Sequence, residues 1–68
     1  MQHAKQLSTF INSRIDETGE AVPFWEIVRF AQELDPALFF RVDETDPDMI
    51  EFLFQDDSDI SLTYRADL

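Results

Sequence analysis

Residues 38–64, LFFRVDETDPDMIEFLFQDDSDISLTY, decide the fold of this chain. Apolar and polar side chains alternate there with a period of two, the period of a β-strand, in three runs. The stretches between the runs, DETDPD at 43–48 and DDSD at 56–59, are rich in turn-forming residues and short enough for hairpins. The segment therefore predicts a three-stranded antiparallel meander.

The alternation gives the meander one apolar face, which we expect to receive the rest of the core. This face consists of Leu38, Phe40, Val42, Ile50, Phe52, Phe54, Ile60, Leu62 and Tyr64. The hairpin lengths favour registers that place Phe40 opposite Phe52, and Phe52 opposite Leu62.

The reverse face of the meander is mixed. The first register sets Arg41 opposite Glu51 and Phe39 opposite Leu53 on that face, with Met49 further along. Nothing in the sequence is left to cover Phe39, Met49 and Leu53, so we expect an open apolar contact surface there.

Two helices are expected before the sheet, because apolar residues recur at three- and four-residue spacing. The first stripe is Ala4, Leu7, Phe10, Ile11 and Ile15, and the second is Phe24, Ile27, Val28, Ala31 and Leu34. Gly19 ends the first helix, Pro23 sits at the start of the second, and Pro36 ends it. The fold class is α+β, with two N-terminal helices packed on one face of the meander (ααβββ), and residues 1–68 form a single domain.

Charge is distributed unevenly along the 68 residues, whose net charge is −10. Residues 1–34 carry five acids and three bases, whereas residues 35–68 carry ten acids and two bases. The span 43–59 contains eight acids and no base, interleaved with large apolar residues. The sequence therefore predicts an acidic folded surface rather than an acidic tail.

The inventory of reactive side chains argues against an enzyme and against a metal or cofactor. The chain has one histidine, His3, near its end, one lysine, Lys5, and no cysteine, so a nucleophile with a base and an orienting group is not assembled. The acidic runs lack the alternating ligands and glycine of a calcium loop. With no cysteine, no secretory signal pattern and no apolar run of membrane length, a cytoplasmic location is expected, the host cytoplasm if the protein is viral.

The sign of the charge disfavours direct binding of nucleic acid and favours a basic protein partner. We expect a small non-enzymatic inhibitor or regulator that docks as a phosphate mimic on a nucleic-acid-binding protein. In composition the chain is similar to small acidic inhibitors that viruses and mobile elements encode, although no motif assigns it to a family. The expected partner-binding residues are Asp43, Glu44, Asp46, Asp48, Glu51, Asp56, Asp57 and Asp59. The acids could also serve solubility alone.

Two alternatives stay open at this point. The protein could be a homodimer or other homo-oligomeric adaptor subunit that associates through Phe39, Met49 and Leu53. Trp25 either covers the edge of the core, the interpretation we favour, or is an exposed contact residue. Arg14 lies within the first apolar stripe, where it either extends its guanidinium to water or pairs with an acid of the sheet or of a second subunit.

Overall fold

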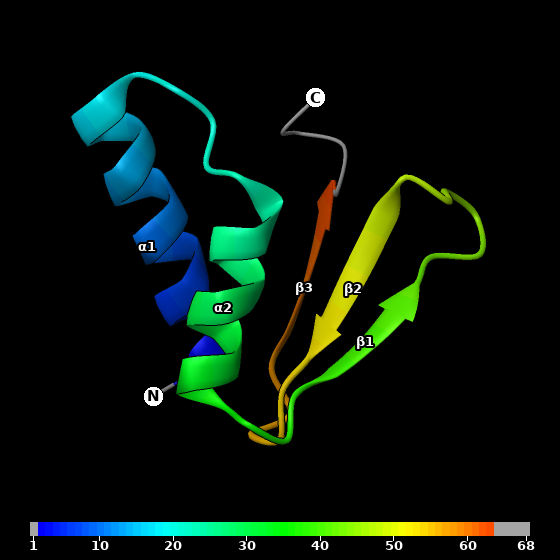
Figure 1. Ribbon diagram of the computed structural model, residues 1–68. Coiled ribbons are helices and arrows are strands. Elements are labelled where there is room, and N and C mark those ends of the chain that lie inside the picture. Colours follow the sequence, from blue (N-terminus) through cyan, green and yellow to red (C-terminus); the bar gives the residue numbers. More distant parts are fainter. Residues whose placement is uncertain (1, 64–68) are drawn as a thin grey trace.

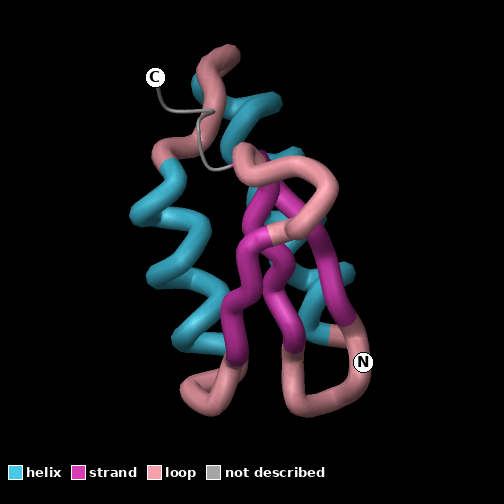
Figure 2. The backbone as a smooth tube through the Cα atoms, turned by 90° about the vertical axis from the view of Figure 1, so that its right-hand side faces the viewer, coloured by secondary structure: helices cyan, strands magenta, loops and turns pink. Residues whose placement is uncertain are grey.

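The computed structural model describes residues 2–63, and the predicted α+β order is confirmed. The elements are α1 (His3–Thr18), α2 (Phe24–Leu34), β1 (Phe39–Val42), β2 (Met49–Leu53) and β3 (Asp59–Thr63). The strands form one antiparallel sheet in the order β1-β2-β3. Figure 1 shows the two helices together on one side of the strands, and Figure 2 shows the strands in front of them after a quarter turn. The chain therefore forms a helical layer against a small sheet.

The helices end where the local sequence predicts. Gly19 adopts a left-handed conformation with φ 71°, and its N–H donates to the Ile15 carbonyl at 2.7 Å. A residue without a Cβ takes that conformation at little cost. Pro23 precedes α2 as its N-cap, and Asp35 is extended directly before Pro36. Gly19 therefore ends α1, Pro23 precedes the first residue of α2, and Pro36 disfavours helical geometry at Asp35 and so ends α2.

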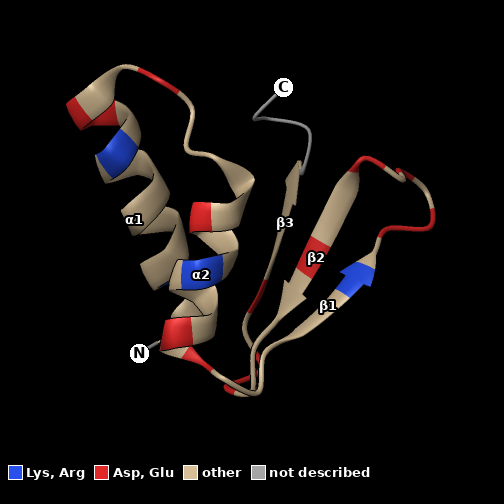
Figure 3. Cartoon of the chain, viewed as in Figure 1, with Lys and Arg blue, Asp and Glu red and all other residues tan. Residues whose placement is uncertain are grey.

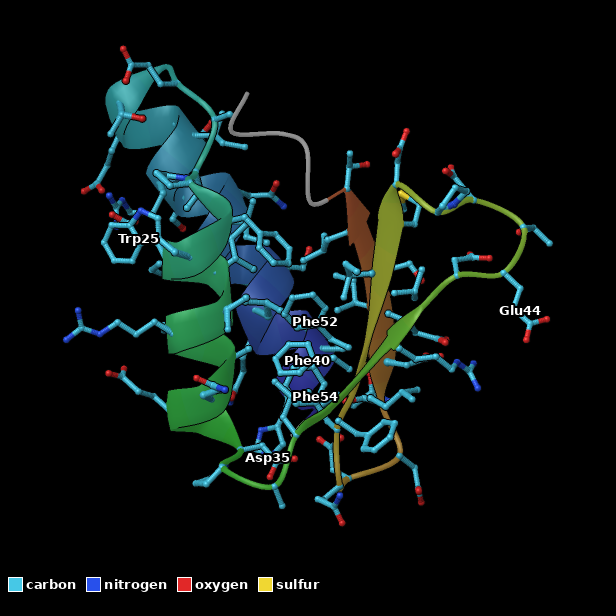
Figure 4. The ribbon with its side chains drawn as sticks, turned by 45° about the vertical axis from the view of Figure 1, so that its right-hand side comes forward. Trp25, Asp35, Phe40, Glu44, Phe52 and Phe54 are labelled. Atoms are coloured by element: carbon cyan, nitrogen blue, oxygen red, sulfur yellow. The ribbon has the colours of Figure 1, made fainter. Side chains whose placement is uncertain are left out.

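The core lies between the helices and the sheet. Its buried apolar residues come from both helices, the connection between them, β2 and the turn after it: Ala4, Leu7, Val22, Ile27, Ala31, Phe52 and Phe54. The Phe52 ring packs edge-to-face on Phe40 at 5.0 Å and on Phe24 at 6.0 Å, between α2 and the sheet (Figure 4). Full burial of one such ring contributes about 1.5–3 kcal/mol. Phe52 therefore joins the two layers.

Val42 differs from the prediction that it belongs to the core. Its parity matches that of Phe40, yet its side chain is 55% exposed. β1 is the strand that lies farthest from the helices in Figure 1, and Val42 is at the end of this strand. Alternation determines which face a side chain occupies, but coverage depends on how far the opposing layer extends. Tyr64, also assigned to the core face, lies outside the described residues.

The register of the first hairpin is confirmed and that of the second is wrong. Phe40 lies opposite Phe52, as predicted. Phe52, however, pairs with Ile60 rather than Leu62, and Leu62 pairs with Ile50. The difference of two residues keeps every side chain on its predicted face, because side chains alternate with a period of two.

The pairing of Phe52 with Ile60 follows from a tight turn at the end of β2, which makes the connection to β3 shorter than predicted. The Phe54 N–H donates to the Ser58 carbonyl at 3.0 Å, and the Asp57 N–H donates to the Phe54 carbonyl at 3.2 Å. Asp57 has φ 69°, a left-handed conformation that aspartate tolerates better than most residues. A turn followed by a left-handed residue is the usual form of a three-residue hairpin loop. Because the sequence has no glycine here, this loop was not predicted.

Candidate functional site

The fold divides the predicted acidic surface between opposite ends of the sheet. The connection 43–48 joins β1 to β2 at one end, and the turn 55–58 joins β2 to β3 at the other. Figure 3 shows acidic residues in both connections and a further one within β2. Since β2 has five residues, the two ends are about 17 Å apart along the strand. The eight predicted contact residues therefore form separate groups rather than one patch.

Hydrogen bonds within the loop 43–48 hold its backbone in place. One carboxylate oxygen of Asp43 accepts the Thr45 N–H at 2.8 Å and the Thr45 hydroxyl at 2.7 Å. One carboxylate oxygen of Asp46 accepts the Asp48 N–H at 3.1 Å. The bond from the Thr45 hydroxyl, followed by the one from its N–H, lowers the pKa of Asp43 below its usual value. Asp43 is therefore ionised at neutral pH.

Glu51 lies between the two acidic groups, on the open face of the sheet. Arg41 pairs with it across the strands, its Nε donating to the Glu51 carboxylate at 3.0 Å. The register predicted that Arg41 lies opposite Glu51, and the structure shows that the two side chains form an ion pair. The pair compensates the charge of Glu51. Arg41, the base adjacent to the loop 43–48, therefore neutralises Glu51 rather than an acid of the loop. The loop and this pair line a hollow of about 350 Å³, formed by Arg41, Val42, Asp43, Glu44, Thr45 and Glu51.

The turn 55–58 is built into the start of α1. One oxygen of Asp56 accepts the Ser58 N–H at 2.9 Å and the Ser58 hydroxyl, and the other accepts the His3 N–H at 2.7 Å. The Ser58 hydroxyl oxygen in turn accepts the Ala4 N–H at 3.1 Å. The bond from the Ser58 hydroxyl is the largest cause that lowers the pKa of Asp56 to about 2. Asp56 and Ser58 therefore cap a helix that begins 53 residues earlier.

Serine, histidine and aspartate meet at this turn, but not in the geometry of a nucleophilic triad. The Ser58 hydroxyl donates to Asp56, and His3 contributes its main-chain N–H. The His3 imidazole instead packs on the Phe54 ring at 5.6 Å between centroids. A triad needs the imidazole between the hydroxyl and the carboxylate. The contacts at the turn are those of a helix cap, and the expectation of a non-enzymatic protein stays a prediction.

Asp35 is a buried carboxylate that the sequence analysis did not single out. Its two oxygens accept the Ala37 N–H at 3.1 Å and the Gln55 N–H at 2.7 Å, and the residue is 7% exposed. Asp35 thus ties the end of α2 to the turn after β2 (Figure 4). The signal was available in part, because aspartate directly before a proline is typical of a turn that the aspartate side chain stabilises.

Trp25 is exposed, which contradicts the favoured interpretation that it covers the core edge. Its side chain is 60% exposed and points away from the sheet in Figure 4. It borders a shallow hollow of about 310 Å³ on the outer side of the helices, together with Phe10, Arg14, Glu26, Arg29, Phe30 and Glu33. Phe10 and Phe30 stack at 4.0 Å between ring centroids and cover the adjoining part of the core. Trp25 is therefore left at the surface of α2.

Arg14 pairs with an acid on the neighbouring helix, rather than with an acid of the sheet or of a second subunit. Its guanidinium lies 2.8 Å from the Glu26 carboxylate and 5.7 Å from the centre of the Phe10 ring. Glu26 lies in the first turn of α2, where the helix dipole also favours a carboxylate. The pair therefore links α1 to α2.

The open face of the sheet is partly apolar, as predicted. Phe39 is 62% exposed, whereas Met49 and Leu53 are half-buried. The Thr63 hydroxyl donates to the Met49 sulfur at 3.1 Å. Phe39 and Leu53 lie opposite each other in the register. The exposed part of this face is thus concentrated at β1.

The described residues contain no group of three or more acids or histidines placed to hold a metal ion. Neither helix in residues 2–63 has the length and apolar character needed to cross a lipid bilayer. The chain matches no protein-family model, no curated protein and no solved structure. The surface of the described residues thus offers two acidic groups and the exposed parts of β1 as candidate contacts.

Proposed function

We propose that the protein is a small non-enzymatic inhibitor or regulator that docks on a basic, nucleic-acid-binding surface of a partner protein. The loop 43–48 acts as the phosphate mimic. The observation that carries the proposal is a difference between the acids: Asp56 and Asp35 bind backbone groups of distant segments, whereas Asp43 and Asp46 bind within their own loop. The negative charges of Asp43 and Asp46 are therefore available to a partner.

Two features suit this loop to binding. Its carboxylates follow one another along a short connection, and Arg41, the neighbouring base, is paired with Glu51. Glu44 projects from the side of the molecule opposite the helices (Figure 4). The side-chain to backbone bonds of Asp43 and Asp46 restrict the loop before binding, which reduces the entropy lost on docking. A dense row of fixed negative charges also steers a cationic surface into contact.

The test is capture of partners from the native host on the immobilised protein, at about 0.1 M and 1 M sodium chloride. We expect a basic nucleic-acid-binding protein at low salt, less of it at high salt, and its displacement by duplex DNA. The variant D43N/E44Q/D46N/D48N should slow its association and reduce capture. Asparagine at positions 43 and 46 keeps the carbonyl oxygen that these turns need, so the fold should be retained.

The matched control removes four exposed charges from the helical half: D16N/E17Q/E20Q/E33Q. These acids are exposed and lie outside the sheet connections. Retained capture by this control, with loss in the loop variant, supports the proposal because both variants have the same net charge. Equal loss in both would show that net charge alone attracts the partner. Unchanged capture by both would refute the proposed role of the loop 43–48.

The second candidate function is a homo-oligomeric adaptor that associates through Phe39, Met49 and Leu53. The exposure of Phe39 favours it, because a large aromatic side chain 62% exposed on a strand is a typical contact residue. Apolar association should persist at high salt. Light scattering and melting over a hundredfold dilution range test it. A monomer mass with an unchanged melting temperature would exclude this candidate.

A further inference from the structure

The free edge of β1 lies directly before the acidic loop 43–48. We infer that this edge takes an extended basic segment of the partner as an added antiparallel strand, which would become the fourth strand of the sheet. The inference rests on the proposed function and names the kind of segment that binds. In strand addition, main-chain hydrogen bonds provide affinity, and alternate side chains provide specificity.

The position of β1 leaves its outer edge open. β1 is the first strand in the order β1-β2-β3, and no described residue pairs with its outer side. The other edge of the sheet belongs to β3, which lies near α1. Figure 1 shows β1 on the side of the sheet away from both helices. An incoming segment would therefore meet β1 before any other strand.

The backbone of β1 directs hydrogen-bonding groups to this edge. The Asp43 N–H donates to the Met49 carbonyl at 3.1 Å, so the backbone groups of residue 43 face β2. Backbone groups alternate along a strand, so those of Arg41 also face β2. The N–H and C=O groups of Phe40 and Val42 therefore point away from the sheet, in the arrangement that an antiparallel strand can pair with.

The side chains of β1 do not protect this edge. Natural edge strands are commonly shielded by lysine, proline, a bulge or an inward charge. The four residues of β1 contain no lysine or proline, and the charge they carry, on Arg41, is paired with Glu51 of β2. Phe39 and Val42 are 62% and 55% exposed. The edge thus combines unpaired backbone groups with apolar side chains that an added strand would cover.

The charge around β1 selects a basic segment. Residues directly opposite each other in a sheet share a face, and opposite charges in such pairs are favourable. The partner residue opposite Asp43 should therefore be lysine or arginine, and the residue opposite Arg41 should not be. Apolar residues should lie opposite Phe39 and Val42. The segment is then expected to carry a base and, four positions later, an apolar residue.

The probe is a synthetic peptide, Lys-Lys-Val-Thr-Thr-Val, acetylated and amidated, whose residues face positions 44 to 39 in that order. A first control replaces both lysines by glutamate. A second control keeps the sequence but carries N-methyl groups on the valine facing Val42 and the threonine facing Phe40, which removes the two amide donors. Binding is measured by titration calorimetry or by amide shifts in NMR spectra. Loss of two main-chain hydrogen bonds should weaken binding by about tenfold.

The expected result is binding by the lysine peptide, weakening by either peptide control, and slower exchange of the Phe40 and Val42 amides in the complex. The variant Val42→Pro, which lacks the outward N–H, should weaken binding similarly, whereas Val42→Thr should not. If Val42→Pro fails to fold, the N-methylated peptide still shows whether main-chain hydrogen bonds to β1 contribute to binding.

Equal binding by the methylated and unmethylated peptides would overturn the inference but leave electrostatic docking intact. The proposed function has its own test, in the loss of the captured partner by the loop variant. Absence of binding by all peptides overturns the strand-addition inference directly.

Discussion

The two connections of the sheet contain the same short motif, an aspartate followed two residues later by threonine or serine, but only the connection 55–58 also binds the start of α1. Asp43 accepts both the N–H and the hydroxyl of Thr45, and Asp56 accepts both from Ser58. Beyond that, Asp56 and Ser58 also accept two N–H groups of α1, at His3 and Ala4. Aspartate followed two residues later by a hydroxyl residue builds a local turn. Whether that turn also supports the rest of the fold depends on what packs against it.

The two connections also differ in what they contribute to the start of α1. The first turn of α1 has no acidic residue, and its N-cap Gln2 makes no side-chain capping bond. Unsatisfied N–H groups at a helix start need acceptors, and the turn 55–58 supplies them. The loop 43–48 has no such task among the described residues. Substitutions should therefore affect stability at one end of the sheet and association at the other.

Substitutions of the apolar residues that flank the two connections should show the largest difference in unfolding free energy between the two ends of the sheet. Phe54→Ala removes a side chain 5% exposed that packs on His3, and should cost about 3–5 kcal/mol of unfolding free energy. Val42→Ala, at the exposed end of β1, should change it by less than about 0.5 kcal/mol. Urea titration measures both. Similar losses in the two variants would show that the ends are equally important for stability.

Removing the hydroxyl groups of the two motifs should produce a smaller difference in stability. Ser58→Ala removes a buried group that accepts the Ala4 N–H, and the loss of such a cap costs about 1 kcal/mol. Thr45→Ala acts on an exposed loop and should have a much smaller effect. Thermal melts of both variants, with helix content followed by circular dichroism, make the comparison. A Thr45→Ala variant that melts lower than Ser58→Ala would contradict the assignment of the cap.

Acid should affect the turn 55–58 more than the loop 43–48. The folded-state pKa of Asp56 is lowered from 3.8 to about 2, mainly by the Ser58 hydroxyl. A lowered pKa contributes stability that is present above 3.8 and is lost as the pH falls towards about 2. Asp56→Asn should therefore flatten the loss of stability over this range. The pKa of Asp43 is also lowered, mainly by the Thr45 hydroxyl, so Asp43 should likewise contribute stability that is lost as the pH falls.

Melting temperatures measured at a series of acidic pH values test this for both variants. Asp43→Asn is the matched control, because it removes one carboxylate from the equivalent motif. If the two variants flatten the profile equally, the bond from Asp56 to α1 adds nothing to acid sensitivity.

The smallest effect expected is that of salt on stability. Folding brings the acids of the span 43–59 closer together, so sodium chloride should raise the melting temperature by screening their repulsion. The variant D43N/E44Q/D46N/D48N should show less of this rise than D16N/E17Q/E20Q/E33Q. A melting temperature that falls with salt would instead mean that ion pairs such as Arg41 with Glu51 dominate.

The sequence by itself determined the elements and their order. The change of period after Pro36 separated helices from strands, and Gly19 set the end of α1. The alternation assigned each strand residue to a face, and the first register followed from it. These features are local, because they depend on backbone preferences and side-chain period over a few residues, and the sequence states both directly.

The tertiary structure alone decided how the acids are used. Asp43 and Asp56 are equivalent in their local sequence, but the turn at Asp56 folds against the start of α1, while the loop at Asp43 lies at the opposite end of the sheet. The exposure of Val42 and Trp25 was decided in the same way, by how far each layer covers the other. Such contacts join residues up to 54 positions apart. No local pattern encodes them, because their free energy comes from the packing of whole elements rather than from neighbouring residues.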